Sequence, residues 1–202
     1  MSNLSVVQSG SWSDIAGMIR IELPPWIGDV ADFGKTYTTR EERMRLAIAL
    51  ARENVLRDRG GPFGAAIFEC ESGRLIGVGV NRVVPLNNSV LHAEMVAFME
   101  AEAKVGSYTL AKEGMPAHEI VTTCEPCAMC LGASLWAGVR RIICAANRHD
   151  AARLRFDEGP VFPQSHEYME ARGIEIVHDV LREEACAVFQ LYLDHGGPIY
   201  NA

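Results

Sequence analysis

Three of the six cysteines in this 202-residue chain stand close together, in the stretch TCEPCAMC at positions 123–130. On a helix, Cys127 and Cys130 would lie one turn apart on the same face. Pro126 suits the first position of such a helix, because its missing N–H group has no partner to lose there. The start of a helix favours thiolates, and two thiolates at this spacing suit Zn²⁺. The stretch therefore predicts part of a metal site.

A tetrahedral site needs a third protein ligand, and His92 in the sequence LHAE is the candidate. It precedes a second predicted helix, and neighbouring helices of an open sheet can begin side by side. Glu94 follows two residues later, about 200° around an ideal helix, so we expect it to approach the open fourth position instead of the metal. Three ligands, one open position and a carboxylate are typical of a catalytic zinc site, where the metal lowers the pKa of water and the carboxylate moves protons.

Other interpretations of the cysteines are weaker. A redox pair has no need of His92 and Glu94, and an iron–sulfur run would need a fourth cysteine where Ser134 stands. A purely structural zinc site could add Cys124, but we expect this residue before the helix, at a strand end, as a packed thiol near the site. The three remaining cysteines stand in apolar segments and are expected to pack in the core, namely Cys70, Cys144 and Cys186.

The elements that must position these residues follow from the spacing of apolar side chains. Helices are expected over 39–59, 93–105, from the cysteine stretch to about 137, and 182–195, with a short one after 145. A hairpin is expected from 65–68 and 75–80, and further strands over 118–123, 141–145 and 174–177. Thr39 is the expected cap of the first helix. This alternation predicts an α/β protein, a three-layer α/β/α sandwich.

The bulk composition sets the class of protein. With 49% apolar residues the chain can bury one core, so we expect an arm at 1–40, packed through Trp12, Trp26 and Phe33, and one domain at 41–202. The net charge of −7 does not favour nucleic acid as a partner. Without a membrane-length apolar run or signal-like start, we expect a cytoplasmic protein with reduced cysteines and no membrane partner.

The pairing of His92-x-Glu94 with Pro126-Cys127-x-x-Cys130 resembles the signature of zinc nucleobase deaminases, in the cytidine-deaminase-like superfamily. This resemblance implies a central mixed five-stranded sheet. It also implies one Zn²⁺ per subunit on His92, Cys127 and Cys130, with Glu94 as the main proton shuttle. A non-catalytic, zinc-stabilised binding module remains as an alternative, but such a module would have no use for Glu94.

Further stretches look like bacterial guanine deaminases: GPFGAA at 61–66, NRV at 81–83, CEPC through WA at 124–137, and FDEGP at 156–160. Residues 170–174 and IYN at 199–201 resemble a branch that also acts on triazines such as ammeline. The resemblance, over about 40–202, implies hydrolysis of guanine to xanthine and ammonia. It implies Glu158 as a second acid and a set of substrate-binding residues, namely Phe63, Asn81, Ala93, Trp136, Phe156 and Tyr200. It also implies a homodimer in which the C-terminal segment, with Tyr200, can be exchanged between subunits.

Plainer roles stand beside these. Asn81 could end a strand, Phe63 and Trp136 could be core residues, and Glu158 could be a solvated loop acid. A tRNA adenosine deaminase shares the core motif but would need a basic groove. Many relatives have Asp-Pro and a small residue before the histidine, where this chain has NSVL at 88–91. Leu91 therefore either narrows the site or packs in the core.

Overall fold

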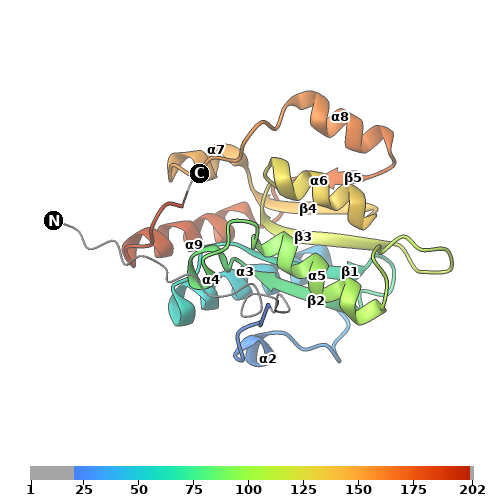
Figure 1. Ribbon diagram of the computed structural model, residues 1–202, viewed down its shortest axis with the longest axis horizontal. Helices are drawn as coiled ribbons and strands as arrows, with labels where there is room; N and C mark the ends of the chain where they lie inside the picture. Colours follow the sequence, from blue (N-terminus) through green and yellow to red (C-terminus); the bar gives the residue numbers. More distant parts are fainter. Residues whose placement is uncertain (1–20, 201–202) are drawn as a thin grey trace, which may run out of the picture.

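The computed structural model describes residues 21–200 (Figure 1). Within this range five strands form a sheet in the order β2-β1-β3-β4-β5. Strand β1 runs antiparallel to β2 and β3, whereas β3, β4 and β5 are parallel. The mixed five-stranded sheet is therefore confirmed. Its strands are β1 (Gly64–Glu69), β2 (Leu75–Val80), β3 (His118–Cys124), β4 (Arg141–Ala146) and β5 (Glu175–Val177).

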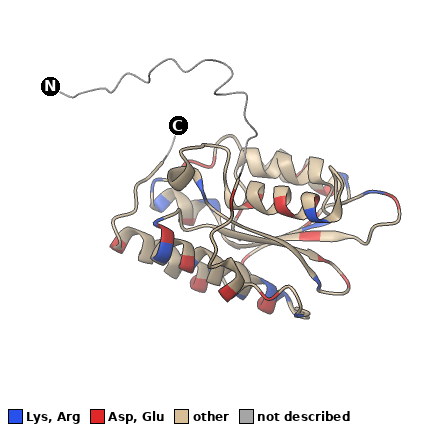
Figure 2. Ribbon diagram, turned by 60° about the horizontal axis from the view of Figure 1, so that its bottom comes forward, with Lys and Arg blue, Asp and Glu red and all other residues tan. Residues whose placement is uncertain are grey.

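Helices cover both faces of the sheet, which Figure 2 shows nearly edge-on. Helices α3 (Arg40–Asp58) and α9 (Arg182–Asp194) pack with one set of strand side chains, which includes Ala66 and Phe68. Helices α5 (Ala93–Val105) and α6 (Ala128–Ala137) pack on the other face, against a set that includes Ala65 and Ile67. Because both faces are covered, β1 and β2 are buried along their whole length. The three-layer sandwich is confirmed.

Most helix boundaries agree with the sequence prediction, and one detail is corrected. Thr39 caps α3: its side chain accepts a hydrogen bond from the Glu42 amide, and the Glu42 carboxylate accepts from the Thr39 amide in return. Helix α6 ends at Ala137 as predicted, but it begins at Ala128. Cys127, in an extended conformation, is its N-cap, so Pro126 precedes the cap and does not occupy the first helical position.

Helix α7 (Arg148–Arg153) is the predicted short helix after β4, but three others were not predicted. These are α2 (Ile27–Val30), α4 (Val83–Leu86) and α8 (Pro163–Ala171). Two of them span only four residues, and in α8 Met169 is the one buried residue. A helix that buries so little shows no apolar periodicity in the sequence.

The described part of the N-terminal arm packs on α3. Trp26 and Ile27 are buried, and the Trp26 indole donates a hydrogen bond of 3.1 Å to Asp58. Phe33 is partly exposed, with Lys104 over its ring. Trp12 lies outside the described residues. The remaining cysteines divide, because Cys144 is fully buried as expected whereas Cys70 and Cys186 are only partly buried.

The sheet and its helices approach each other very closely at two glycines. A Cβ atom on Gly79 of β2 would lie 2.0 Å from the carbonyl oxygen of Ala93, at the start of α5. One on Gly64 of β1 would lie 2.3 Å from the carbonyl oxygen of Ala47 in α3. Only glycine allows this packing, which fixes the start of α5, and with it His92, against the sheet. None of the helices in residues 21–200 combines the length and apolar character that crossing a membrane requires.

Candidate active site

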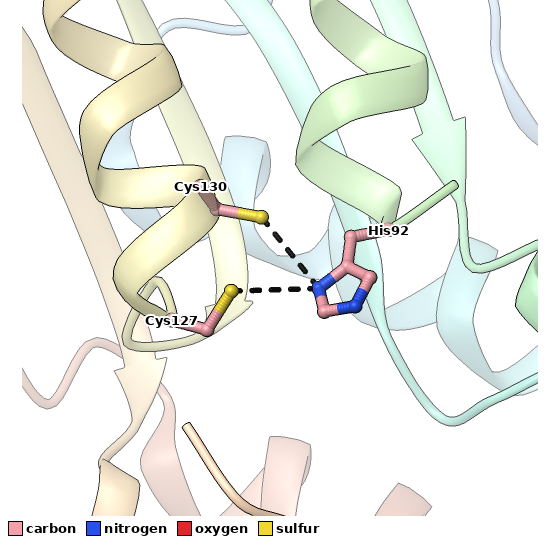
Figure 3. A group of neighbouring side chains, drawn as sticks. All are labelled: His92, Cys127 and Cys130. Carbon is pink, nitrogen blue, oxygen red and sulfur yellow. Dashed lines mark hydrogen bonds between the residues drawn. The ribbon is translucent and has the colours of Figure 1, made fainter. Parts of the chain in front are cut away.

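Helices α5 and α6 begin side by side, and their first residues bring the predicted metal ligands together (Figure 3). His92 is the N-cap of α5, Cys127 is the N-cap of α6, and Cys130 lies in the first turn of α6. The Nδ1 atom of His92 lies 3.5 Å from Sγ of Cys127 and 3.6 Å from Sγ of Cys130. Among residues 21–200, these three form the one group whose geometry could hold a metal ion.

The donor set and its spacing fit Zn²⁺. Tetrahedral zinc bonds of ordinary length would place a histidine nitrogen and a cysteine sulfur about 3.6 Å apart, which agrees with both distances. The hydrogen bond between the two thiols lowers the pKa of Cys127, with help from His92, and raises the pKa of Cys130. The site therefore favours one thiolate by itself, and a bound cation would favour the second. Cys124 ends β3, its thiol faces the carbonyl of Asn147, and it lies outside the ligand group as expected.

Glu94 lies beside this group, in the first turn of α5. Its carboxyl group is almost fully buried, and burial raises its pKa above that of an exposed glutamate. It lines the same cavity as His92 and Cys127. A carboxyl group in that place can accept and return a proton within the cavity.

Glu158 lines the cavity from the loop that follows α7. Burial, and then the Cys127 thiolate and Glu94, raise the pKa of its carboxyl group to about 8. Its backbone carbonyl accepts a hydrogen bond of 3.0 Å from the amide of Ala128, which fastens the loop to the start of α6. The cavity, of about 180 Å³, therefore contains two carboxyl groups whose pKa values are both raised.

Three aromatic rings form one wall of the cavity. Phe63 and Phe156 meet edge to face with their centroids 5.1 Å apart, and Tyr200 meets Phe156 in the same way at 5.2 Å. The Tyr200 hydroxyl is buried and has no hydrogen-bond partner among the described residues. Tyr200, close to the C-terminal end of the described residues, thus completes this wall of the cavity.

Asn81 lies both at the end of a strand and at the cavity. It follows the end of β2, and its Oδ1 atom accepts a hydrogen bond of 3.2 Å from the amide of Val83. It is also buried and lines the cavity. The turn therefore holds the amide in place at the cavity.

Two of the predicted substrate-binding residues, Ala93 and Trp136, do not line this cavity. Trp136 is 81% exposed on the outer side of α6, where it borders a different surface hollow. Its position near the end of α6 carries it away from the cavity, which lies at the start of that helix. Ala93 is fully buried and packs in the core between α5 and the sheet. Leu91 is also buried and does not line the cavity, so it packs instead of narrowing the site.

The cavity also has lining residues that the sequence did not single out: Val83, Ser89, Glu125 and Asp157. Each lies inside one of the sequence stretches described above, so those stretches were the signal that could have identified it. Glu125 has a structural task, since its carboxylate accepts from the Arg148 amide at 3.1 Å and pairs with His178 at 2.9 Å.

Comparisons with known proteins agree with this geometry. Residues 37–146 match the model of the cytidine and deoxycytidylate deaminase zinc-binding region. A guanine deaminase from Bacillus subtilis is 36% identical over 143 residues, which cover 71% of this chain and 87% of the relative.

Two solved structures share the fold over most of both chains. A guanine deaminase from Nitrosomonas europaea has 42% identity and a TM-score of 0.83, covering 87% of this chain and 96% of its own. The protein NE0047 in complex with 2,6-diaminopurine has 42% identity and a TM-score of 0.84, covering 91% and 97%. The chain therefore belongs to the cytidine and deoxycytidylate deaminase family, through the zinc-binding region that holds His92, Glu94, Cys127 and Cys130.

Proposed function

We propose that this chain hydrolyses free guanine to xanthine and ammonia. The observation that carries the proposal is the cavity itself, where the buried carboxyl group of Glu94, the partly buried one of Glu158 and a zinc-type ligand set share the lining with three aromatic rings. The similar proteins from B. subtilis and N. europaea are guanine deaminases, and a mutant of NE0047 was solved with 8-azaguanine. Both lines of support point to a purine base as the substrate.

One Zn²⁺ per chain, held by His92, Cys127 and Cys130, is part of the proposal. When bound, it would supply a Lewis acid that activates water at neutral pH. All six cysteines are free thiols, as a reducing compartment such as the cytoplasm would keep them.

The size and walls of the cavity suit a single base. Its volume of about 180 Å³ is below the roughly 300–1,000 Å³ of sites for drug-sized ligands, which favours a free base over a nucleotide. Phe63, Phe156 and Tyr200 would contact the faces and edges of the purine ring. Asn81 would hydrogen-bond its polar edge. This arrangement would orient the amino-bearing carbon, C2, toward Glu94.

The two carboxyl groups account for the protons of the reaction. Glu94 takes a proton from the attacking water and delivers it to the adjacent ring nitrogen of guanine. Glu158, whose pKa is raised, is placed to protonate the departing amino group, with Glu94 as the other donor. The carbon–nitrogen bond then breaks and ammonia leaves, while the hydroxyl group on C2 gives its proton back to the same carboxylate and becomes the carbonyl of xanthine.

A panel of amino-heterocycles tests the substrate. We expect ammonia release from guanine to exceed release from guanosine, cytosine, cytidine and adenine, with ammeline as the second base to be turned over. Purified, zinc-loaded protein that makes no xanthine from guanine would contradict the proposal. Faster release from a tRNA anticodon stem-loop would favour a tRNA deaminase instead.

Replacing Glu94 tests the proton chemistry. Glu94→Gln keeps the size of the side chain but cannot accept the proton, so kcat should fall by about 10²- to 10⁴-fold. Glu158→Gln should reduce kcat and remove the alkaline limb of the pH profile. That limb is expected at or below about pH 8 in the unchanged protein, because a bound cation can only lower the pKa of Glu158. Glu170→Gln, an exposed change on α8, is the control, and equal activity in all three variants would contradict the mechanism.

Metal content separates the three cysteines of the opening stretch. Cys127→Ser removes a thiolate ligand and should leave less than one Zn²⁺ per two chains after dialysis, whereas Cys124→Ser should retain about one per chain. Atomic emission on purified protein measures both. Equal loss in the two variants would mean that Cys124 is a ligand.

We also propose that the chain forms a homodimer through the outer side of α5 and α6. Trp136 and Tyr108 are 81% and 90% exposed, and they border a hollow formed by Met95, Phe98, Met99 and Ala133. The protruding Trp136 of one copy can fit the hollow of a second copy, and the reverse, in a two-fold contact.

Light scattering tests the dimer. The unchanged protein should have twice the chain mass, and Trp136→Glu should halve it. Leu193→Glu, on the opposite layer, should leave the mass unchanged, and a monomeric unchanged protein would refute the dimer.

A further inference from the structure

Asn54 is a fully buried polar residue in the last turns of α3, outside the wall of the cavity. The two hydrogens of its amide are both used. Its Nδ2 atom donates to the carbonyl of Gly61 at 2.9 Å and to the carbonyl of Asn81 at 2.9 Å. One side chain therefore joins two segments that lie 20 residues apart in the sequence.

Both segments form the base-binding side of the cavity. Gly61 begins the turn that carries Phe63, and Asn81 is itself a lining residue. The two segments also bond to each other, since the amide of Asn81 donates to the carbonyl of Phe63 at 3.1 Å. The Asn54 carboxamide thus fixes the distance between these two segments and α3.

The surrounding atoms leave the carboxamide little freedom. A Cβ atom on Gly60 would lie 2.3 Å from Nδ2 of Asn54, and one on Gly61 would lie 1.9 Å from the hydroxyl of Tyr200. The Gly60-Gly61 pair is therefore packed between Asn54 on one side and Tyr200 on the other. A displacement of the Asn54 carboxamide would therefore displace Gly60 and Gly61, and with them Tyr200 in the cavity wall.

The next turn of α3 holds the adjoining residue. Asp58, four residues after Asn54, accepts hydrogen bonds from Arg82 at 2.7 Å and from Trp26 at 3.1 Å. Side chains on the same side of α3 thus form hydrogen bonds with both Asn81 and Arg82.

Stability alone does not explain an asparagine at position 54. Its Oδ1 atom is buried without a hydrogen-bond partner among the described residues, and an unpaired buried acceptor is destabilising. Most other buried positions of α3 are apolar. The amide donors therefore have a task that an apolar residue could not perform.

We propose that Asn54 is a positioning residue for base recognition, which holds Asn81 and the Phe63 turn at the separation that the substrate requires. This inference rests on the proposed function, because it concerns the same cavity. The metal ligands lie on α5 and α6, across the sheet from α3, so Asn54 acts on the base-binding side and not on the metal.

Asn54→Leu, with similar volume and no donor, and Asn54→Ala test the role. We expect KM for guanine to rise about three- to tenfold, the equivalent of one lost hydrogen bond, with a smaller change in kcat and unchanged zinc content. Gly60→Ala leaves Asn54 in place but displaces its carboxamide, and should raise KM in the same direction. This third variant also covers the case in which the Asn54 variants do not fold.

The control is Leu50→Ala, a fully buried change one turn earlier on α3 that should lower stability without raising KM. If the Asn54 and Gly60 variants keep the KM of the unchanged protein, or if Leu50→Ala raises KM equally, the positioning role is refuted.

The dissociation constant of 8-azaguanine, measured calorimetrically on zinc-loaded protein, separates the positioning role from the proposed function. Unchanged protein that binds this base but makes no xanthine would refute the proposed function alone, and the variants would then be compared by binding. Unchanged protein that neither binds nor reacts would refute both.

Discussion

The site depends on one constraint: two helices must begin at the same point. Strands β2 and β3 both run antiparallel to β1, so they are parallel to each other, and each is followed by a helix on the same face. The carboxyl ends of parallel strands meet at one edge of a sheet, and the helices that follow begin there. His92 and Cys127, as the two N-caps, are brought together by this topology. The close contact at Gly79 then fixes the distance between α5 and the sheet.

The charges of the groups in this arrangement favour a bound cation. The thiols of Cys127 and Cys130 lie beside a single imidazole, that of His92, and the carboxyl groups of Glu94 and Glu158 line the same small cavity. Ionising more than one of these groups without a cation would bury like charges together, and each raises the pKa of the others. A divalent metal lets the thiols ionise and leaves the carboxyl groups free to exchange protons. A cavity with raised carboxyl pKa values and balanced thiolate charge would suit proton transfer.

The sequence predicted the residues that local chemistry brings together, but it did not predict which residues line the cavity where the path of a helix decides this. The strands, the main helices and the separation of Cys124 from Cys127 and Cys130 follow from apolar spacing and helix geometry. Trp136 was assigned to the wall because it belongs to a family-like stretch, but six residues beyond Cys130 a helix has moved about 9 Å along its axis. Helix α8 was missed because it buries almost nothing. Asn54 is one of many polar residues of α3, and only the structure shows that it is buried and that its amide donates to two separate segments.

The two faces of the sheet divide the work of the cavity. The α5–α6 face supplies the metal ligands and Glu94, whereas the α3 face, through Asn54 and Asp58, holds the segments that would contact the base. A change on the α3 face can therefore alter which base fits without disturbing the groups that activate water. This separation gives a physical reason why one metal motif can serve deaminases with different substrates, since the fold fixes the chemistry and the opposite layer shapes the cavity.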